Sequence, residues 1–401
     1  MDLELTDEQK ALEDSVREFL DAECPVSLVR RVVEDPSEGS KGAEELWGKM
    51  VELDWPAMAV GEEEGGLGLG FVELAVVSEQ LGRAISPAPF LATAGQFVPA
   101  LRVAGSPEQR HRFLEPVARR GSVGTLAVAE ASGSFDVTSI EAEAVADGDH
   151  FVLRGTKHFV LDAARADEVV AAARLPGTSG TGGLGLFVVP RGAVSCEPMH
   201  NIDATRQYCT IVLDGALVER DRVLGSPGSG DVAKALALVL EEATAALAVE
   251  MVGTCQAIFD IVHEYVGQRE QFGVKIGSFQ AIKHKLADMY VALESARATA
   301  YFAALCIAEN DERRSLAVST AKSAAGDCQK LLAQQAIQCL GGIGYTWEHD
   351  IHMYVKRAKA SAALFGTAAE HRARVAESIG LGRPGVPGAA GVPGAASGAG
   401  R

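Results

Sequence analysis

The spacing of apolar residues changes twice along this chain, and that order constrains the fold more than any other feature of the sequence. Up to residue 121 apolar residues recur at helical spacing, and Thr6 opens the first helix with a capping-box pattern. Over 122–228 the spacing drops to two, in short runs separated by Gly, Asp and Pro. Helical spacing then returns. We therefore predict an α+β protein with a helical domain at 1–121, an antiparallel β domain at 122–228 and a helical bundle at 229–379.

The last unit contains two long helical segments, and a tail of different composition follows it. One helix is predicted over about 316–340. The helix before it carries an apolar stripe at three- and four-residue spacing, made by Phe279, Ile282, Leu286, Met289 and Leu293. The end of the chain, 380–401, is rich in Gly, Pro and Ala and has no aromatic residue, so we expect a disordered tail.

Composition excludes several classes of partner. A formal net charge of -17 argues against a nucleic-acid groove or an anionic membrane surface, because both require surplus Lys and Arg. The 7 cysteines are scattered, without a C-x-x-C pair or a His at ligand spacing, which predicts buried thiols in a reducing compartment and no metal site. We find no signal-peptide block and no apolar run long enough to cross a bilayer. We therefore expect a cytoplasmic protein whose partners are other proteins or small molecules.

Two glycine-containing motifs are candidates for binding. The stretch QCLGGIGY at 338–345 could bring backbone amides close to a phosphate, or it could be a tight turn between two helices. It is not a Rossmann fingerprint, since no strand precedes it. The stretch QREQFGVKIGSFQ at 268–280 places a cation, amides and two aromatic rings around a glycine turn, which suits a planar ring or a diphosphate. The alternative is a solvated charged turn with Phe272 and Phe279 in the core.

Taken in order, these segments and others resemble the acyl-CoA dehydrogenase family over about residues 3–372. The resemblance also includes EEEGGLGLGFVELAVVSEQLGRAISPAPF, GTKHFVLDAARAD, DATRQYCTIVLDGALVERDRVLG and LFGTAAEHR. It implies an N-terminal helical domain, a middle β domain and a C-terminal four-helix bundle. It also implies FAD and removal of hydrogens from the α and β carbons of a CoA thioester, with a carboxylate base facing the flavin.

The reactive groups of the family are replaced in this chain. In the family a Glu base precedes the Gly-Thr of LFGT, and Phe365 occupies that position here. Some members carry the Glu on the first bundle helix instead, where this chain has Ala243, followed by Thr244 in place of the usual Arg. Glu241 and Glu242 are adjacent, and either a relocated base or a solvated helix face would account for them. We therefore predict no catalytic residue in this chain.

The positions that contact the flavin ring in the family are also changed. Ala129 replaces a Thr whose hydroxyl binds the ring, and Leu161 replaces a second Thr on the next strand. Ordinary core substitution is the alternative explanation, although it would rarely remove every reactive group of one site. The residues that reach the neighbouring subunit's flavin in the family remain: Arg269, Gln271, Phe272, Gln280, Gln338, Gly341 and Gly342.

This combination resembles the subunit that lacks the base in actinobacterial heterotetrameric dehydrogenases acting on CoA thioesters of steroid side chains. The resemblance implies a homologous acyl-CoA dehydrogenase subunit as partner, two copies of each chain, an acyl-CoA substrate and an acceptor like electron-transfer flavoprotein. The steroid assignment rests on analogy alone. Two other interpretations remain, a self-sufficient homotetramer with a relocated base such as Glu242, and a flavin-free interaction or scaffold protein of this fold.

Overall fold

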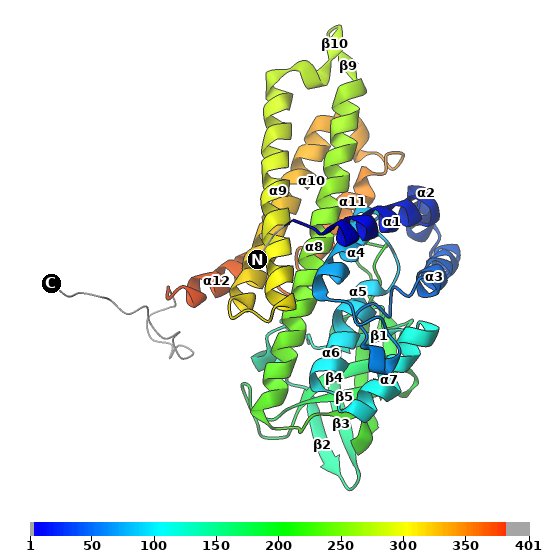
Figure 1. The fold of residues 1–401 in the computed structure, drawn as a ribbon, viewed down its shortest axis with the longest axis vertical. Helices are drawn as coiled ribbons and strands as arrows, with labels where there is room; N and C mark the ends of the chain where they lie inside the picture. The colour runs from blue at the N-terminus through cyan, green and yellow to red at the C-terminus, as the bar shows by residue number, and fades with distance from the viewer. Residues whose placement is uncertain (1–3, 382–401) are drawn as a thin grey trace, which may run out of the picture.

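The computed structural model describes residues 4–381, and its elements follow the predicted order of helices, sheet and helices (Figure 1). The strands lie at the lower end of the view and the long bundle helices extend to the upper end. The predicted tail from residue 382 onward lies outside the described residues. The α+β architecture agrees with the predicted fold class.

The first helices begin where capping residues place them. The Thr6 hydroxyl accepts a hydrogen bond from the backbone N–H of Gln9, and the Gln9 side chain accepts from Thr6 in return. Ser106 and Gln109 form a second capping box. The N-terminal unit comprises α1 (Asp7–Glu23), α2 (Val26–Glu34), α3 (Pro36–Glu52), α4 (Phe71–Arg83), α5 (Phe90–Ala92), a π turn (Thr93–Phe97), α6 (Val98–Ala104) and α7 (Pro107–Arg120).

The middle sheet is mixed, which corrects the prediction of a wholly antiparallel unit. Its strands run in the order β6-β7-β3-β2-β4-β5-β8, and β1 pairs with β4 in parallel. The bounds are β1 (Gly124–Ala127), β2 (Glu143–Asp147), β3 (His150–Leu161), β4 (Glu168–Arg174), β5 (Leu184–Pro190), β6 (Ser195–Pro198), β7 (Tyr208–Glu219) and β8 (Val223–Leu224). Alternation of residue type does not distinguish the two pairings, because it reports which face is buried and not the strand direction. A register shift between Lys157 and Val160 bends β3, and Phe159 there has a φ of 57°.

The C-terminal unit is built from three long helices that alternate in direction. These are α8 (Gly230–Gln268), α9 (Gln280–Ala308) and α10 (Arg314–Leu340), and α11 (Ile351–Ser361) and α12 (Ala368–Ser378) follow. A two-stranded turn, β9 (Glu270–Gln271) with β10 (Val274–Lys275), joins α8 to α9. Met289 and Leu293 of the predicted stripe are buried, but Phe279 is 38% exposed, because the hairpin tip projects beyond the rest of the bundle.

Two glycines bring α4 and α8 into direct backbone contact. A Cβ atom at Gly82 would collide with the carbonyl oxygen of Glu250, and one at Gly253 would collide with that of Glu79. Only glycine permits this approach. The N-terminal helices and the bundle therefore share one core.

A buried ion network joins the three units. Arg357 of α11 donates to Glu250 of α8 at 2.8 Å and lies 2.8 Å from Asp203, in the loop before β7. Arg206 of the same loop also pairs with Glu250, and Arg357 donates to the backbone oxygen of Ser86 at 3.0 Å. The side chains of these four ionic residues are all buried. The network therefore fixes the middle loop, the bundle and the segment after α4 relative to one another.

Three further expectations from the sequence concern the cysteines, metal sites and membrane-spanning segments. All seven cysteines are free thiols. Among residues 4–381 no group of three or more His, Cys, Asp and Glu is placed to hold a metal ion. The expectation that no apolar run is long enough to cross a bilayer is corrected by α9, which is long and apolar enough, although core helices of soluble proteins can be so too.

Candidate functional site around Phe365 and the tip of the bundle

The turn between α11 and α12 holds the residue at the predicted base position. Helix α11 ends at Ser361 and α12 begins at Ala368, so the break starts earlier than the Gly-Thr pair. Phe365 has a φ of 58°, which is unusual for a bulky residue, and it is 3% exposed. A capping box between Thr367 and Glu370 starts the next helix. The turn is thus an ordered part of the structure.

Two buried side chains hold the carbonyl groups of this turn. The ammonium of Lys322 donates to the carbonyl oxygens of Ser361, Ala362 and Gly366 at 3.3, 3.2 and 2.9 Å. Burial lowers the pKa of Lys322 to about 8. His371 lies 3.0 Å from the Phe365 carbonyl through Nε2, and burial lowers the pKa of that imidazole to about 4. Because neutral His371 has one N–H and its neighbour is a carbonyl, Nε2 carries the proton.

Phe365 contacts an aromatic ring of the middle domain. The rings of Phe135 and Phe365 meet edge to face, with centroids 5.1 Å apart. Both line a cavity of about 220 Å³ that also has walls from α8, α10 and α12. Sequence reasoning did not identify Phe135, Lys322 or His371, although the Thr367 capping pattern was a local signal of an ordered turn.

The two glutamates near the alternative base position are both paired. Glu242 is buried between Arg102 and Arg314, and burial raises the pKa of its carboxyl. Glu241 lines the cavity beside Phe365, but it accepts a hydrogen bond from Arg314 at 2.7 Å and another from Ser315. Of the two, Glu241 is therefore the one that shares a cavity with Phe365.

The flavin-facing positions of the middle domain are apolar and covered. Ala129 and Leu161 are both buried. The Thr125 hydroxyl donates to the carbonyl oxygen of Leu161 at 2.6 Å, so it is already used. Lys157 of β3 pairs with Glu130 at 2.6 Å, and burial lowers the pKa of this lysine to about 8. Neither Ala129 nor Leu161 carries the hydroxyl that the family resemblance leads one to expect at its position.

The seven candidate cofactor residues lie at the far end of the bundle. All are exposed: Arg269, Gln271, Phe272, Gln280, Gln338, Gly341 and Gly342. Helix α8 ends there, α9 begins there, and α10 ends there because the three helices alternate in direction (Figure 1). The end of α8 lies roughly 36 Å along the helix from Thr244, which lines the cavity beside Phe365. This chain therefore does not bring the seven residues to its own Phe365.

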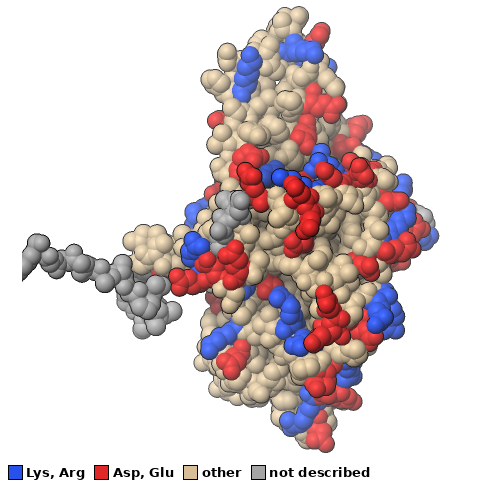
Figure 2. Space-filling model, in the orientation of Figure 1, with Lys and Arg blue, Asp and Glu red and all other residues tan. Residues whose placement is uncertain are grey.

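The hairpin tip is open to solvent. Phe272 is 93% exposed and its ring lies 6.3 Å from that of Phe279, so the alternative that placed both in the core is wrong. Within residues 4–381 the Arg269 guanidinium has no hydrogen-bond or ion-pair partner. Figure 2 shows a few basic and acidic side chains among uncharged groups at the upper end, and a denser gathering of both kinds lower down, around α1. An unpaired guanidinium beside exposed rings can bind a diphosphate and stack on a planar group.

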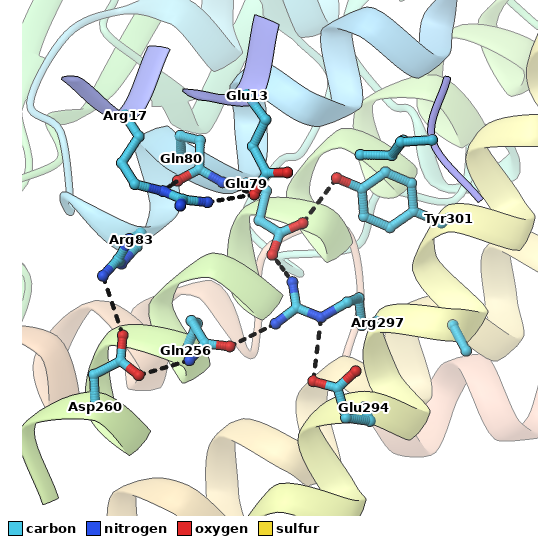
Figure 3. Close-up of a pocket in the computed structure, with 12 residues that line it drawn as sticks. Glu13, Arg17, Glu79, Gln80, Arg83, Gln256, Asp260, Glu294, Arg297 and Tyr301 are labelled. Carbon is cyan, nitrogen blue, oxygen red and sulfur yellow. Dashed lines mark hydrogen bonds and ion pairs between the residues drawn. The ribbon is translucent and has the colours of Figure 1, made fainter. Parts of the chain in front are cut away.

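A larger polar cavity lies between α1, α4, α8 and α9 and encloses about 640 Å³ (Figure 3). Arg297 pairs with buried Glu79, whose other oxygen accepts from the Tyr301 hydroxyl at 2.8 Å. Arg83 pairs with Asp260 across the same cavity. Since every charged side chain that lines it is paired, it has no free ionic group for a ligand. We assign it to the junction between the N-terminal helices and the bundle.

Comparisons with known proteins cover nearly all of the described chain. Residues 6–121, 125–215 and 234–380 match the N-terminal, middle and C-terminal domains of acyl-CoA dehydrogenase. The mitochondrial 2-methylacyl-CoA dehydrogenase of Solanum tuberosum is 30% identical over 371 residues, which cover 90% of this chain and 88% of that protein.

Two of the similar solved structures are complexes of two different chains. A chain of the ChsE4-ChsE5 complex from Mycobacterium tuberculosis is 25% identical with a TM-score of 0.82, and the match covers 94% of this chain and 99% of that one. A variant of the Tcur3481-Tcur3483 steroid acyl-CoA dehydrogenase is 28% identical with a TM-score of 0.81, covering 93% and 98%. The chain therefore belongs to the acyl-CoA dehydrogenase family, whose members are FAD-dependent oxidoreductases.

Proposed function

We propose that this chain is a subunit of a cytoplasmic, heteromeric acyl-CoA dehydrogenase that oxidises the α,β bond of a CoA thioester. It completes the FAD site of its partner and has no catalytic carboxylate of its own. One contrast carries the proposal. Phe365 is buried against Phe135 at the base position, while seven cofactor-type residues stand exposed at the other end of the bundle.

The chemistry of the two ends supports this division. Proton abstraction next to a thioester needs a base, which neither Phe365 nor Ala243 can supply. FAD supplies oxidised flavin as the hydride acceptor. At the tip Arg269 can pair with its diphosphate and Phe272 can stack on a planar ring, while Gly341, with a φ of 65°, lets the backbone approach closely. The tip residues fit part of an FAD molecule, whereas buried Ala129 and Leu161 give a flavin ring no hydroxyl.

The likeness to two heteromeric complexes supports the choice of partner. We infer a homologous acyl-CoA dehydrogenase chain, two copies of each subunit and an acceptor of the electron-transfer flavoprotein type. For the acyl group we infer a steroid side chain, because one of those complexes is a steroid enzyme. Turnover of a steroid side-chain CoA thioester, compared with butyryl-CoA, tests that inference. Faster turnover of butyryl-CoA would contradict it.

Glu241 is the observation that favours a second function, a self-sufficient homotetramer. It shares the cavity with Phe365 and is a carboxylate. Its bonds to Arg314 and Ser315 count against it, because both of its carboxylate oxygens already accept a hydrogen bond. A flavin-free scaffold protein is the third candidate. It would have no need of cofactor-binding groups, so it accounts less well for the unpaired Arg269 beside the exposed Phe272.

The test is the flavin-to-chain ratio, measured with the chain expressed alone and again with a candidate partner chain. We expect about one flavin per two chains, and only in the complex. About one flavin per chain in the protein expressed alone, bleached by an acyl-CoA, would overturn the proposal and direct attention to Glu241. Absence of flavin with every candidate partner would support the scaffold.

A further inference from the structure

Phe135 and Phe365 both line the 220 Å³ cavity and contact each other, and we propose that they form an aromatic plug, so that this chain binds no CoA thioester of its own. The inference rests on the proposed function and deepens it, since a subunit without a base could still bind substrate. The plug consists of the two rings together with the groups that hold each of them in place.

On the middle-domain side the loop that carries Phe135 is ordered by short side-chain bonds. The Ser134 hydroxyl accepts from the backbone N–H of Asp136 at 3.1 Å. The Asp136 carboxylate accepts from the backbone N–H of Thr138 at 2.8 Å. These turns fix the backbone on the C-terminal side of Phe135, so the ring is presented to the bundle from a defined loop.

On the bundle side the turn around Phe365 is clamped at four carbonyl groups. Lys322 binds three of them and His371 binds the carbonyl of Phe365 itself. A positive φ in a bulky residue is strained and persists only where the surroundings impose it. The clamp imposes it here, and it points the ring at Phe135.

The remaining space is too small for a thioester and its acyl chain. The cavity that the two rings line holds about 220 Å³, whereas pockets that bury even a drug-sized ligand enclose roughly 300–1,000 Å³. The ring contact also spans two domains. It therefore joins the middle domain to the bundle without any ligand between them.

The test counts ligands in the co-expressed complex. The probe is S-octyl-coenzyme A, a thioether that lacks the carbonyl group and cannot react, titrated by calorimetry and counted by native mass spectrometry. We expect about one probe per two chains in the wild-type complex. Phe135→Ala, and Phe135→Ala with Phe365→Ala, should raise the count toward one per chain. The matched control is Phe19→Ala, which removes an aromatic pair with Trp55 in the N-terminal helices and should leave the count unchanged.

Folding is checked in each variant by its melting temperature. Phe135→Ala and Phe365→Ala, each made alone, should lower the melting temperature by amounts that do not add in the double variant, because the rings contact each other. One probe per chain in the wild-type complex, or a count that no variant raises, would overturn the plug. Flavin is measured in the same samples. One flavin per two chains with one probe per chain would refute the plug alone, whereas one flavin per chain would refute the proposed function.

Discussion

Phe365 packs against the ring of Phe135, and its backbone carbonyl is bound by His371, so the turn is built for a buried aromatic ring and not for a carboxylate. Phe365→Glu alone should give no dehydrogenase activity in a homomer, because Ala129, Leu161 and Thr244 would still lack the groups that hold a flavin and a thioester. Removing the buried ring should also lower the free energy of unfolding by about 3–5 kcal/mol. Flavin bleaching by acyl-CoA and urea unfolding measure the two effects. Robust turnover by this single variant would refute the proposal that the subunit has no working active site of its own.

His371 should make the stability of the chain depend on acidity. Its pKa falls from 6.5 to about 4 through burial, so the unfolded chain binds a proton between these pH values and the folded chain does not. Stability is therefore full above pH 6.5 and is lost as the pH falls toward 4, by roughly 3 kcal/mol in total. His371→Gln should flatten this part of the profile, measured by urea unfolding at several pH values. An unchanged acid slope would contradict the prediction.

At the scale of the elements, the Arg357 network links α11 to α8 and to the loop before β7. Arg357→Met removes one cationic partner of the buried carboxylates of Asp203 and Glu250. We expect the free energy of unfolding to fall by about 3–5 kcal/mol. Arg372→Met is the matched control. Its pair with Asp327 is more than half exposed on both sides, so it should cost less than about 1 kcal/mol. If both variants lowered the free energy of unfolding equally in urea, the larger contribution assigned to the buried ion pairs would be wrong.

The hairpin between α8 and α9 should matter for the cofactor and not for folding. Arg269→Ala should leave the melting temperature of the isolated chain unchanged, because its guanidinium has no partner there. In the complex it should weaken flavin retention about tenfold to a hundredfold, through loss of a charge-assisted hydrogen bond. Arg119→Ala, an exposed arginine on α7, is the control. Unchanged flavin retention in Arg269→Ala would contradict the assigned role of the tip.

Most elements could be predicted from the sequence because their signals are local. The Thr6 capping box and the helical spacing of Met289 and Leu293 are examples of such signals. The parallel pairing of β1 with β4 could not be predicted, since alternation does not encode strand direction. Nor could the contact of Phe135 with Phe365, because it joins positions 230 residues apart whose side chains are unremarkable until the fold brings them together.

At the scale of the whole molecule, the most exposed aromatic side chains belong to the C-terminal unit. Besides Phe272, Tyr345 and Trp347 are 81% and 64% exposed beyond the end of α10. Patches of this kind mark interaction sites or cause aggregation when they stay uncovered. We expect the chain expressed alone to self-associate, and a co-expressed partner to give a single heteromeric species in size-exclusion chromatography with light scattering. A stable monomer in isolation would contradict this expectation.

The separation of the bundle tip from the turn at Phe365 has a genetic consequence. A residue at the tip can be substituted during evolution only if the surface it contacts on the other gene product changes as well. The turn at Phe365 is buried within this chain, so the partner's surface does not constrain it. On the proposed division of labour, neither gene supplies the reaction alone. Deletion of either one should give the same phenotype, and an organism that inherits one gene without the other should accumulate the same undegraded thioester.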